Sequence, residues 1–256
     1  MITIKTPKEI EILRESGRRL AKIVNTVATL VKPGVTTKEL DDLAYSLVMK
    51  AGDRPAFLDY KPEGAPRSYP ASLCVSINNE VVHGIPNEKK KILKEGDIVS
   101  LDMGLIHRGL ITDHAVTVGV GKIDNKAKQL LEVTKGALLA GIKAAAGGKH
   151  LGDIGYAIEN FVKPYGYSFA EGLSGHGVGY KVHEDPYVPN RGKKGEGLLL
   201  KPGMVIAIEP MLCEGAGKIV LKNDGYTYAT KDRKRSAHFE HTVVITNGGA
   251  EILTLF

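Results

Sequence analysis

Four carboxylates lie inside four of the most apolar stretches of this 256-residue chain. Asp102 and Asp113 belong to one pair of stretches, and Glu209 and Glu240 belong to a second pair. Burying an isolated carboxylate costs several kcal/mol, so such groups are normally paired, hydrogen-bonded or bound to a cation. If the four carboxylates face one another in the fold, they indicate a metal site.

The two pairs are related by an internal repeat. The segment LKEGDIVSLDMG aligns without gaps with LKPGMVIAIEPM, which places Asp102 on Glu209. Further along, TDHAVTV aligns with FEHTVVI and places Asp113 on Glu240. Upstream, PGVTTKELDDLAYSLVMKAG aligns with GGKHLGDIGYAIENFVKPYG. Chance could produce one such match between short strands, but three matches in the same order favour a duplication.

Each half of the repeat reads as two helices followed by strands, with the boundary near Asp124. Thr6 with Glu9, and Thr36 with Glu39, form the capping-box pattern that starts a helix. The runs that contain the carboxylates are rich in β-branched residues, which predicts central strands. We expect halves of about 1–124 and 125–256 within one catalytic domain, residues 1–256, because the two carboxylate pairs need each other.

The histidines divide into candidates for the site and residues with a structural role. His176 lies in GLSGHGVGY, where glycines let the backbone bend closely around an imidazole. His83 and His183 are further candidates, and the spacing leaves open which of the three binds metal. His107, His150 and His238 are expected to be structural or solvated. His114 and His241 are expected at most to lie behind the ligands.

A site of carboxylates with an imidazole narrows the choice of cation. Structural zinc prefers cysteine and histidine, and the glycine loop of a magnesium–phosphate site is not present in the sequence. Carboxylates with histidine fit a pair of Mn, Fe, Co or Zn ions, and availability decides among these metals. Two ions about 3.5–4 Å apart activate water and stabilise an oxyanion, so hydrolysis is the expected chemistry.

The composition is that of a globular enzyme, with 43% hydrophobic and 25% charged residues. Neither a membrane-spanning apolar run nor a signal peptide is recognisable, so we expect a cytoplasmic protein without a membrane partner. The two cysteines, Cys74 and Cys213, are expected to be reduced. The net charge is +6, with basic clusters at 89–91, 191–194 and 231–235. These clusters read as solvated loops or, alternatively, as a contact for the ribosome.

At this point a family resemblance is visible along nearly the whole chain. It is carried by KTPKEIEILRESGR, VVHGIP, SGHGVG, HEDP, IEPM and FEHTVVIT, together with the strands of Asp102 and Asp113. The chain resembles the type I methionine aminopeptidases, which share the pita-bread fold with prolidase and aminopeptidase P. The resemblance implies an α+β fold in which pseudo-twofold helix-helix-strand halves surround a curved antiparallel sheet. It also implies a monomer.

The resemblance further implies two divalent metal ions and a role for each ligand. Asp113 and Glu240 would bridge the ions, and Asp102 would complete the shell of one ion. His176 and Glu209 would bind the other ion, and Glu209 would also move the proton of the attacking water. The implied reaction is removal of the N-terminal methionine from nascent proteins and peptides, favoured by a small second residue.

The resemblance assigns the remaining site residues to substrate contact. His83 and His183 would contact the scissile peptide, while Tyr69, Cys74 and Tyr226 would belong to the methionine pocket. The loop at 61–68 looks longer than in relatives, so its role is open. Two alternatives remain: an X-Pro aminopeptidase or dipeptidase on the same fold, and a catalytically silent module that binds ribosomes or nucleic acid.

Overall fold

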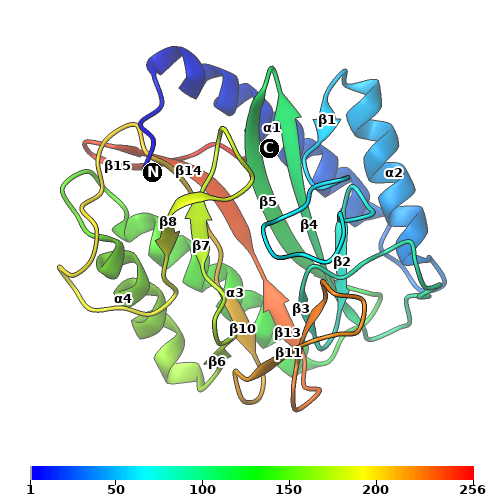
Figure 1. Cartoon of the computed structure of the whole chain (residues 1–256). Coiled ribbons are helices and arrows are strands. Elements are labelled where there is room, and N and C mark those ends of the chain that lie inside the picture. The colour runs from blue at the N-terminus through cyan, green and yellow to red at the C-terminus, as the bar shows by residue number, and fades with distance from the viewer. Residues whose placement is uncertain (1) are drawn as a thin grey trace.

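The computed structural model describes residues 2–256 and has the expected α+β architecture, with helices packed on a curled antiparallel sheet (Figure 1). In each half two helices precede all the strands of that half. The helices are α1 (Pro7–Thr29), α2 (Thr37–Lys50), α3 (Asn125–Ala144) and α4 (Leu151–Val162), followed by the short 3-10 helix η1 (Lys163–Tyr165).

The helix starts confirm the predictions from the sequence. Thr6 and Thr36 each cap a helix, and the glutamate three residues later returns a hydrogen bond to the backbone of the cap. Asp124, at the expected boundary of the two halves, caps α3 through a hydrogen bond from the backbone N–H of Ala127 (2.7 Å). These local signals work because the cap satisfies N–H groups that the first helical turn leaves unpaired.

The main sheet has nine strands among the described residues, in the order β1-β4-β5-β14-β9-β7-β8, with β2 on β4 and β15 on β14. All of its pairings are antiparallel, as expected. Its strands are β1 (Arg54–Pro55), β2 (Cys74–Ile77), β4 (Ile98–His107), β5 (Leu110–Gly119), β7 (Gly175–Gly177), β8 (Glu184–Val188), β9 (Val205–Ile208), β14 (Glu240–Thr246) and β15 (Gly249–Ile252).

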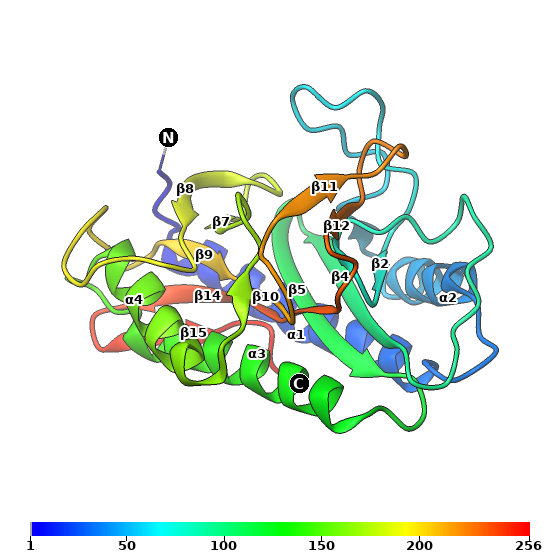
Figure 2. The same cartoon turned by 90° about the horizontal axis from the view of Figure 1, so that it is seen from below.

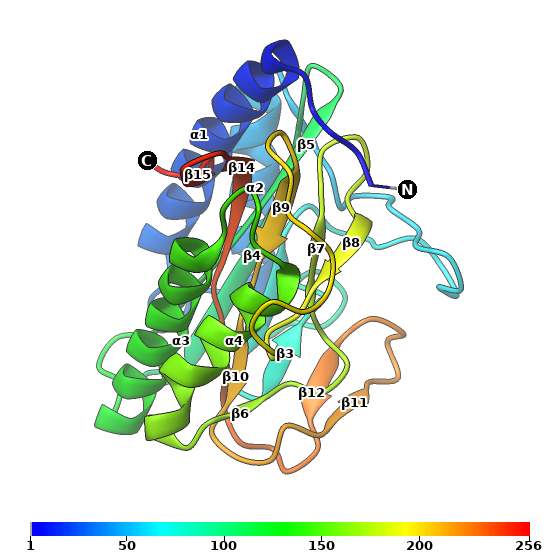
Figure 3. The ribbon, with the colours of Figure 1, turned by 90° about the vertical axis from the view of Figure 1, so that its left-hand side faces the viewer.

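Two small sheets of three strands accompany the main one, in the orders β13-β10-β6 and β11-β12-β3. Their strands are β3 (Glu80–Val82), β6 (Ser168–Phe169), β10 (Met211–Cys213), β11 (Ile219–Leu221), β12 (Tyr228–Thr230) and β13 (Ser236–His238). Figure 3 shows α1, α3 and α4 on one side of the main sheet, with β8, β11 and β12 toward the opposite side. The curl of the sheet is visible from below in Figure 2.

The two halves meet at the contact between β5 and β14, where Glu240 lies opposite Ala115. Each half has its own apolar core. One core packs α1 and α2 against β4, and the other packs α3 and α4 against β9 and β14. Val116 on β5 borders both cores. The carboxylates therefore lie on rigid strands supported from behind by helices, which suits a site with fixed geometry.

The cysteines and the helices bear on two further expectations from the sequence. Cys74 and Cys213 are both buried and free, as expected for reduced cysteines. Among residues 2–256, no helix is long and apolar enough to cross a membrane.

Candidate metal centre

The register of three neighbouring strands brings three of the carboxylates together. On β4 Asp102 lies opposite Ala115, and on β14 Glu240 lies opposite the same alanine from the other side. Asp113 precedes Ala115 by two residues on β5, so it lies on the same face of the sheet. Ala115 is buried, and its small side chain leaves space between the flanking carboxylates.

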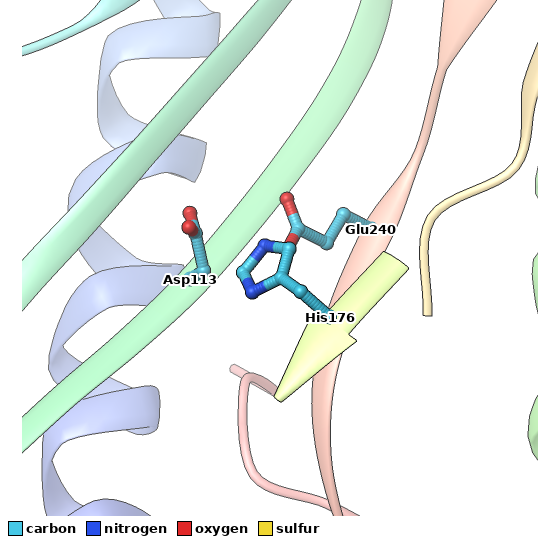
Figure 4. Close-up of side chains that lie close together, drawn as sticks. All are labelled: Asp113, His176 and Glu240. Atoms are coloured by element: carbon cyan, nitrogen blue, oxygen red, sulfur yellow. The ribbon is translucent and has the colours of Figure 1, made fainter. Parts of the chain in front are cut away.

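Glu209 and His176 reach this face from β9 and β7. His176 lies opposite Ala207 in the pairing of β7 with β9, and Glu209 follows Ala207 by two residues. The Nε2 atom of His176 lies 3.3 Å from Oε1 of Glu209. Asp113, His176 and Glu240 each offer a ligand atom within 4.8 Å of the others. Figure 4 shows these three side chains projecting toward one another from β5, β7 and β14.

Burial dominates the electrostatics of the four carboxylates, none of which is more than 8% exposed. Burial raises the pKa of Glu209 to about 8, and burial with the charge of Glu209 raises the pKa of Asp113 to about 8. The pKa values of Asp102 and Glu240 are also raised well above the ordinary range, first by burial and then by the neighbouring carboxylates. Each negative charge at this site is therefore costly without a cation.

The surroundings of these carboxylates fit a divalent cation. Within residues 2–256, no lysine or arginine forms an ion pair with any of the four. Oδ1 of Asp102 and Oε1 of Glu240 are buried without a hydrogen-bond partner in the same part of the chain. Buried carboxylate oxygens are normally satisfied, so these orphaned atoms indicate metal ligands.

His176 is held in the orientation of a ligand. Its Nδ1 lies 2.9 Å from the carbonyl oxygen of Gly177 and must donate to it, which leaves the lone pair on Nε2 available. Burial lowers the pKa of His176 to about 3, so the ring is neutral. A Cβ at Gly175 would lie 2.3 Å from the carbonyl oxygen of Ala207, and one at Gly177 would lie 2.2 Å from that of Asp185. The glycines are therefore required by the close approach of β8 and β9.

His83 and His183 line the same pocket as the carboxylates. The ring centroids of His183 and His176 are 4.5 Å apart, and Oη of Tyr60 is hydrogen-bonded to Nδ1 of His183 at 3.1 Å. His83 follows β3 with a φ of 58°, an unusual conformation for a residue other than glycine. Burial lowers the pKa of His83 to about 4 and also lowers that of His183. Both neutral rings can donate a hydrogen bond into the pocket.

An apolar part of the pocket adjoins the carboxylates. Cys74 lies opposite Asp102 in the pairing of β2 with β4. The rings of Tyr69 and Tyr226 meet edge to face at 5.1 Å, and Tyr69 donates a hydrogen bond to the carbonyl oxygen of Gly84 (2.9 Å). The structure thus places the predicted residues Tyr69, Cys74 and Tyr226 in the pocket wall. Residues 62–66, in the loop of open role, line the same pocket.

Tyr60 and His238 line the pocket and contact predicted site residues, but neither is among the residues predicted from the sequence. Tyr60 contacts His183 as described, and His238 lies beside Glu209, with Nε2 3.3 Å from Oε2. The sequence predicts that His238 is structural or solvated; in the structure it is buried, and Glu209, His238 and Glu240 together offer a second cluster of ligand atoms. One signal was available: His238 precedes Glu240 by two residues, a spacing that places side chains on one face of extended chain.

The other histidines lie outside the ligand cluster, as expected. His107 is hydrogen-bonded to the buried Asp53 at 2.7 Å, and His150 caps α4 next to Asp153. His114 contacts the carbonyl oxygen of Glu240 through Nδ1 and stacks on His241. These last two rings support the backbone behind the ligands.

Comparison with known proteins gives a consistent assignment. Residues 11–247 match metallopeptidase family M24. The methionine aminopeptidase of Aquifex aeolicus is 48% identical over 99% of this chain and 98% of its own length. The crystal structure of the Thermotoga maritima methionine aminopeptidase superposes with a TM-score of 0.95 at 43% identity, covering both chains completely.

A prolidase on the same fold is a more distant relative. The Pyrococcus furiosus enzyme has a TM-score of 0.77 at 25% identity, and 99% of this chain covers only 65% of that one. The expected pita-bread fold and the expected metallo-aminopeptidase class, with a peptide as substrate and a divalent metal, are thereby confirmed. The chain belongs to metallopeptidase family M24, within its methionine aminopeptidase branch.

Proposed function

We propose that this protein removes the N-terminal methionine from peptides and nascent chains with two divalent ions, of Mn, Fe, Co or Zn. One observation carries the proposal: four buried carboxylates and a neutral imidazole converge beside an apolar pocket, and no lysine or arginine of the described residues 2–256 pairs with them. Asp113 and Glu240 would be shared by the two ions. Asp102 would complete the ligands of one ion, and His176 and Glu209 those of the other.

The bound ions would supply an activated water and polarise the carbonyl group of the scissile peptide. Glu209 would take a proton from that water and pass it to the amine that leaves when the C–N bond breaks. A carboxylate beside the attacking water can act first as the base and then as the acid. His83 and His183 would donate hydrogen bonds to the peptide group and stabilise the oxygen that gains negative charge, a role worth a few kcal/mol.

The pocket also supports a choice of substrate. Tyr69, Cys74 and Tyr226 offer an apolar wall next to Asp102, and the flexible thioether of methionine adapts to such walls. The free α-amino group of the substrate would be recognised by the anionic centre, so only the first residue would be released. A small second residue is proposed from the family resemblance.

Three further proposals concern the whole protein. We propose a single catalytic domain, because both halves contribute carboxylates to one centre. We propose a cytoplasmic monomer. A ribosome contact would use the basic clusters, in which Arg191, Lys193 and Lys194 are exposed.

A panel of short peptides tests the proposed specificity. With the metal-loaded protein, mass spectrometry should detect free methionine from Met-Ala-Ser, less from Met-Lys-Ser, and none from acetyl-Met-Ala-Ser. A peptide beginning Ala-Pro should remain intact. Cleavage of the Ala-Pro peptide without release of methionine would instead assign the protein to the proline-specific branch of the fold.

A further inference from the structure

His238 lies at the end of β13, buried to 1% exposure, and the proposed mechanism does not use it. It lines the pocket together with Glu209 and Glu240. Its Nε2 atom lies 3.3 Å from Oε2 of Glu209 and 3.9 Å from Oε2 of Glu240. An imidazole in this position touches the carboxylate proposed to move the proton.

The backbone of His238 is held rigidly. Its N–H donates to Oγ1 of Thr117 (2.9 Å), and its carbonyl oxygen accepts from the same hydroxyl (2.7 Å). Oγ1 of Thr117 also lies 2.8 Å from Oγ of Ser100 on the neighbouring strand. On the other side, His238 pairs with Met211, two residues beyond Glu209. The ring is therefore presented to the carboxylates by strands of both halves.

The ring itself is unsatisfied. Neither Nδ1 nor Nε2 of His238 has a hydrogen-bond partner within residues 2–256, although both are buried. The distance of 3.3 Å to Glu209 is short enough for a hydrogen bond, but the directional requirement is not met. A buried polar atom without a partner needs an explanation, and an ion between these groups provides one for Nε2.

The spacing of the atoms fits coordination. Two donors bound at right angles to one ion, each at about 2.1 Å, lie roughly 3 Å apart. The His238–Glu209 distance of 3.3 Å equals the His176–Glu209 distance on the other oxygen of the same carboxylate. Glu209 thus stands between two imidazole nitrogens. Ligand atoms of Glu209, His238 and Glu240 also lie within 4.8 Å of one another.

We propose that His238 is an additional metal ligand, which binds through Nε2 the ion held by Glu209 and Glu240. This inference rests on the metal centre proposed above and extends it. A second imidazole makes that ion's surroundings richer in nitrogen, which favours Co, Fe or Zn over Mn. His238 would thereby bias the metal preference of the centre.

Metal binding to the stripped protein tests this directly. Isothermal titration with Co and, separately, with Mn should be compared for the unsubstituted protein, His238→Gln, His176→Gln and the control His150→Gln. His238→Gln keeps a polar side chain of similar size, yet removes the imidazole. We expect one cobalt-binding step to weaken by about tenfold or more, with a smaller loss for Mn. His150→Gln should bind like the unsubstituted protein.

X-ray absorption of the cobalt-loaded, unsubstituted protein gives a second readout that does not depend on a variant folding. Two imidazoles in total, shared between two ions, are expected from His176 and His238, and one imidazole would overturn the proposal. Unchanged affinities in His238→Gln alongside weakened binding in His176→Gln would refute the role of His238 alone. Unchanged affinities in both variants would refute the metal centre as well.

Discussion

Asp113 and Thr242 are joined by two hydrogen bonds at the place where β5 and β14 stop pairing through their backbones. The N–H of Asp113 donates to Oγ1 of Thr242 (2.9 Å), and this hydroxyl donates to the carbonyl oxygen of Asp113 (2.7 Å). Regular pairing of the two strands ends at His241, one residue earlier. The threonine side chain thus continues the contact between the halves and fixes the backbone of a proposed bridging ligand.

Thr242→Val should therefore destabilise the protein and weaken metal binding. The buried N–H of Asp113 would lose its acceptor, which costs about 1–3 kcal/mol. Urea denaturation of the metal-free protein measures the first effect, and cobalt titration measures the second. Thr26→Val, on the exposed face of α1, is the matched control and should change stability by less than about 0.5 kcal/mol. Equal stability of the two variants would show that the Thr242 bridge is unimportant.

Glu209→Gln should retain the fold but lose most turnover. The substitution removes a ligand charge and the proposed proton carrier together, and acid–base catalysis typically contributes about 10²- to 10⁴-fold. The rate of methionine release at saturating metal measures the loss, with circular dichroism as the check on folding. Glu132→Gln on the exposed side of α3 serves as the control. Turnover of Glu209→Gln near that of the control would contradict the proposed role.

Tyr60→Phe should slow hydrolysis without affecting metal content. The hydroxyl of Tyr60 orients His183 through the 3.1 Å hydrogen bond, and a bond of this kind is worth about 1 kcal/mol. We expect kcat/KM to fall by about three- to tenfold, while elemental analysis finds the same number of ions. Tyr45, on α2, is exposed, and Tyr45→Phe should leave kcat/KM unchanged. Loss of metal in Tyr60→Phe would mean that the tyrosine supports the ligands rather than His183.

Lys5→Ala should destabilise the loop that carries His183. Nζ of Lys5 lies 2.8 Å from Oε2 of Glu184, and both side chains are almost fully buried. Removing Lys5 leaves the buried carboxylate of Glu184 without an opposite charge, although Thr3 and the backbone N–H groups of Tyr180 and Lys181 still donate to it. We therefore expect a cost of about 2–4 kcal/mol, at or below the usual range of roughly 3–5 kcal/mol. Thermal unfolding should show a lower Tm for Lys5→Ala than for the exposed control Lys8→Ala. Indistinguishable Tm values would indicate that Glu184 has another source of stabilisation.

The metal-free protein should lose stability as pH rises. Asp113 and Glu209, with pKa values of about 8 in the fold, keep their protons where the unfolded chain has released them, above a pKa of roughly 4. The native state then binds more protons, so the free energy of unfolding falls as pH increases from about 4 to 8. Metal should reverse this trend and release protons on binding. Calorimetry in buffers of different ionisation enthalpy measures the release, and a value of zero would contradict the protonated carboxylates.

The parts of the fold that sequence predicts best are those decided locally. The capping residues Thr6 and Thr36 were recognisable because their partners lie three residues away. The strands of Asp102 and Glu240 were recognisable because a buried carboxylate in an apolar β-branched run is conspicuous. The repeat then related the carboxylates of the two halves, since it aligned Asp102 with Glu209 and Asp113 with Glu240.

The parts that sequence could not provide depend on distant contacts. Tyr60 and His183 are 123 residues apart, and both lie outside regular strands, so no periodicity relates them. The position of His238 follows from the pairing of β13 with β10 and from the clamp at Thr117. The spacing of His238 and Glu240 relates those two side chains, but it gives no indication that Glu209 and Thr117 are neighbours of His238.

Release of methionine by the metal-stripped protein tests the central claim most directly. Met-Ala-Ser should be incubated with stripped protein to which Mn, Fe, Co or Zn is added singly in measured steps. We expect no release without metal, and activity that rises until two ions per chain are bound. Lys193→Glu/Lys194→Glu should behave identically on this free peptide. Full release of methionine by protein shown to be free of metal would contradict the account.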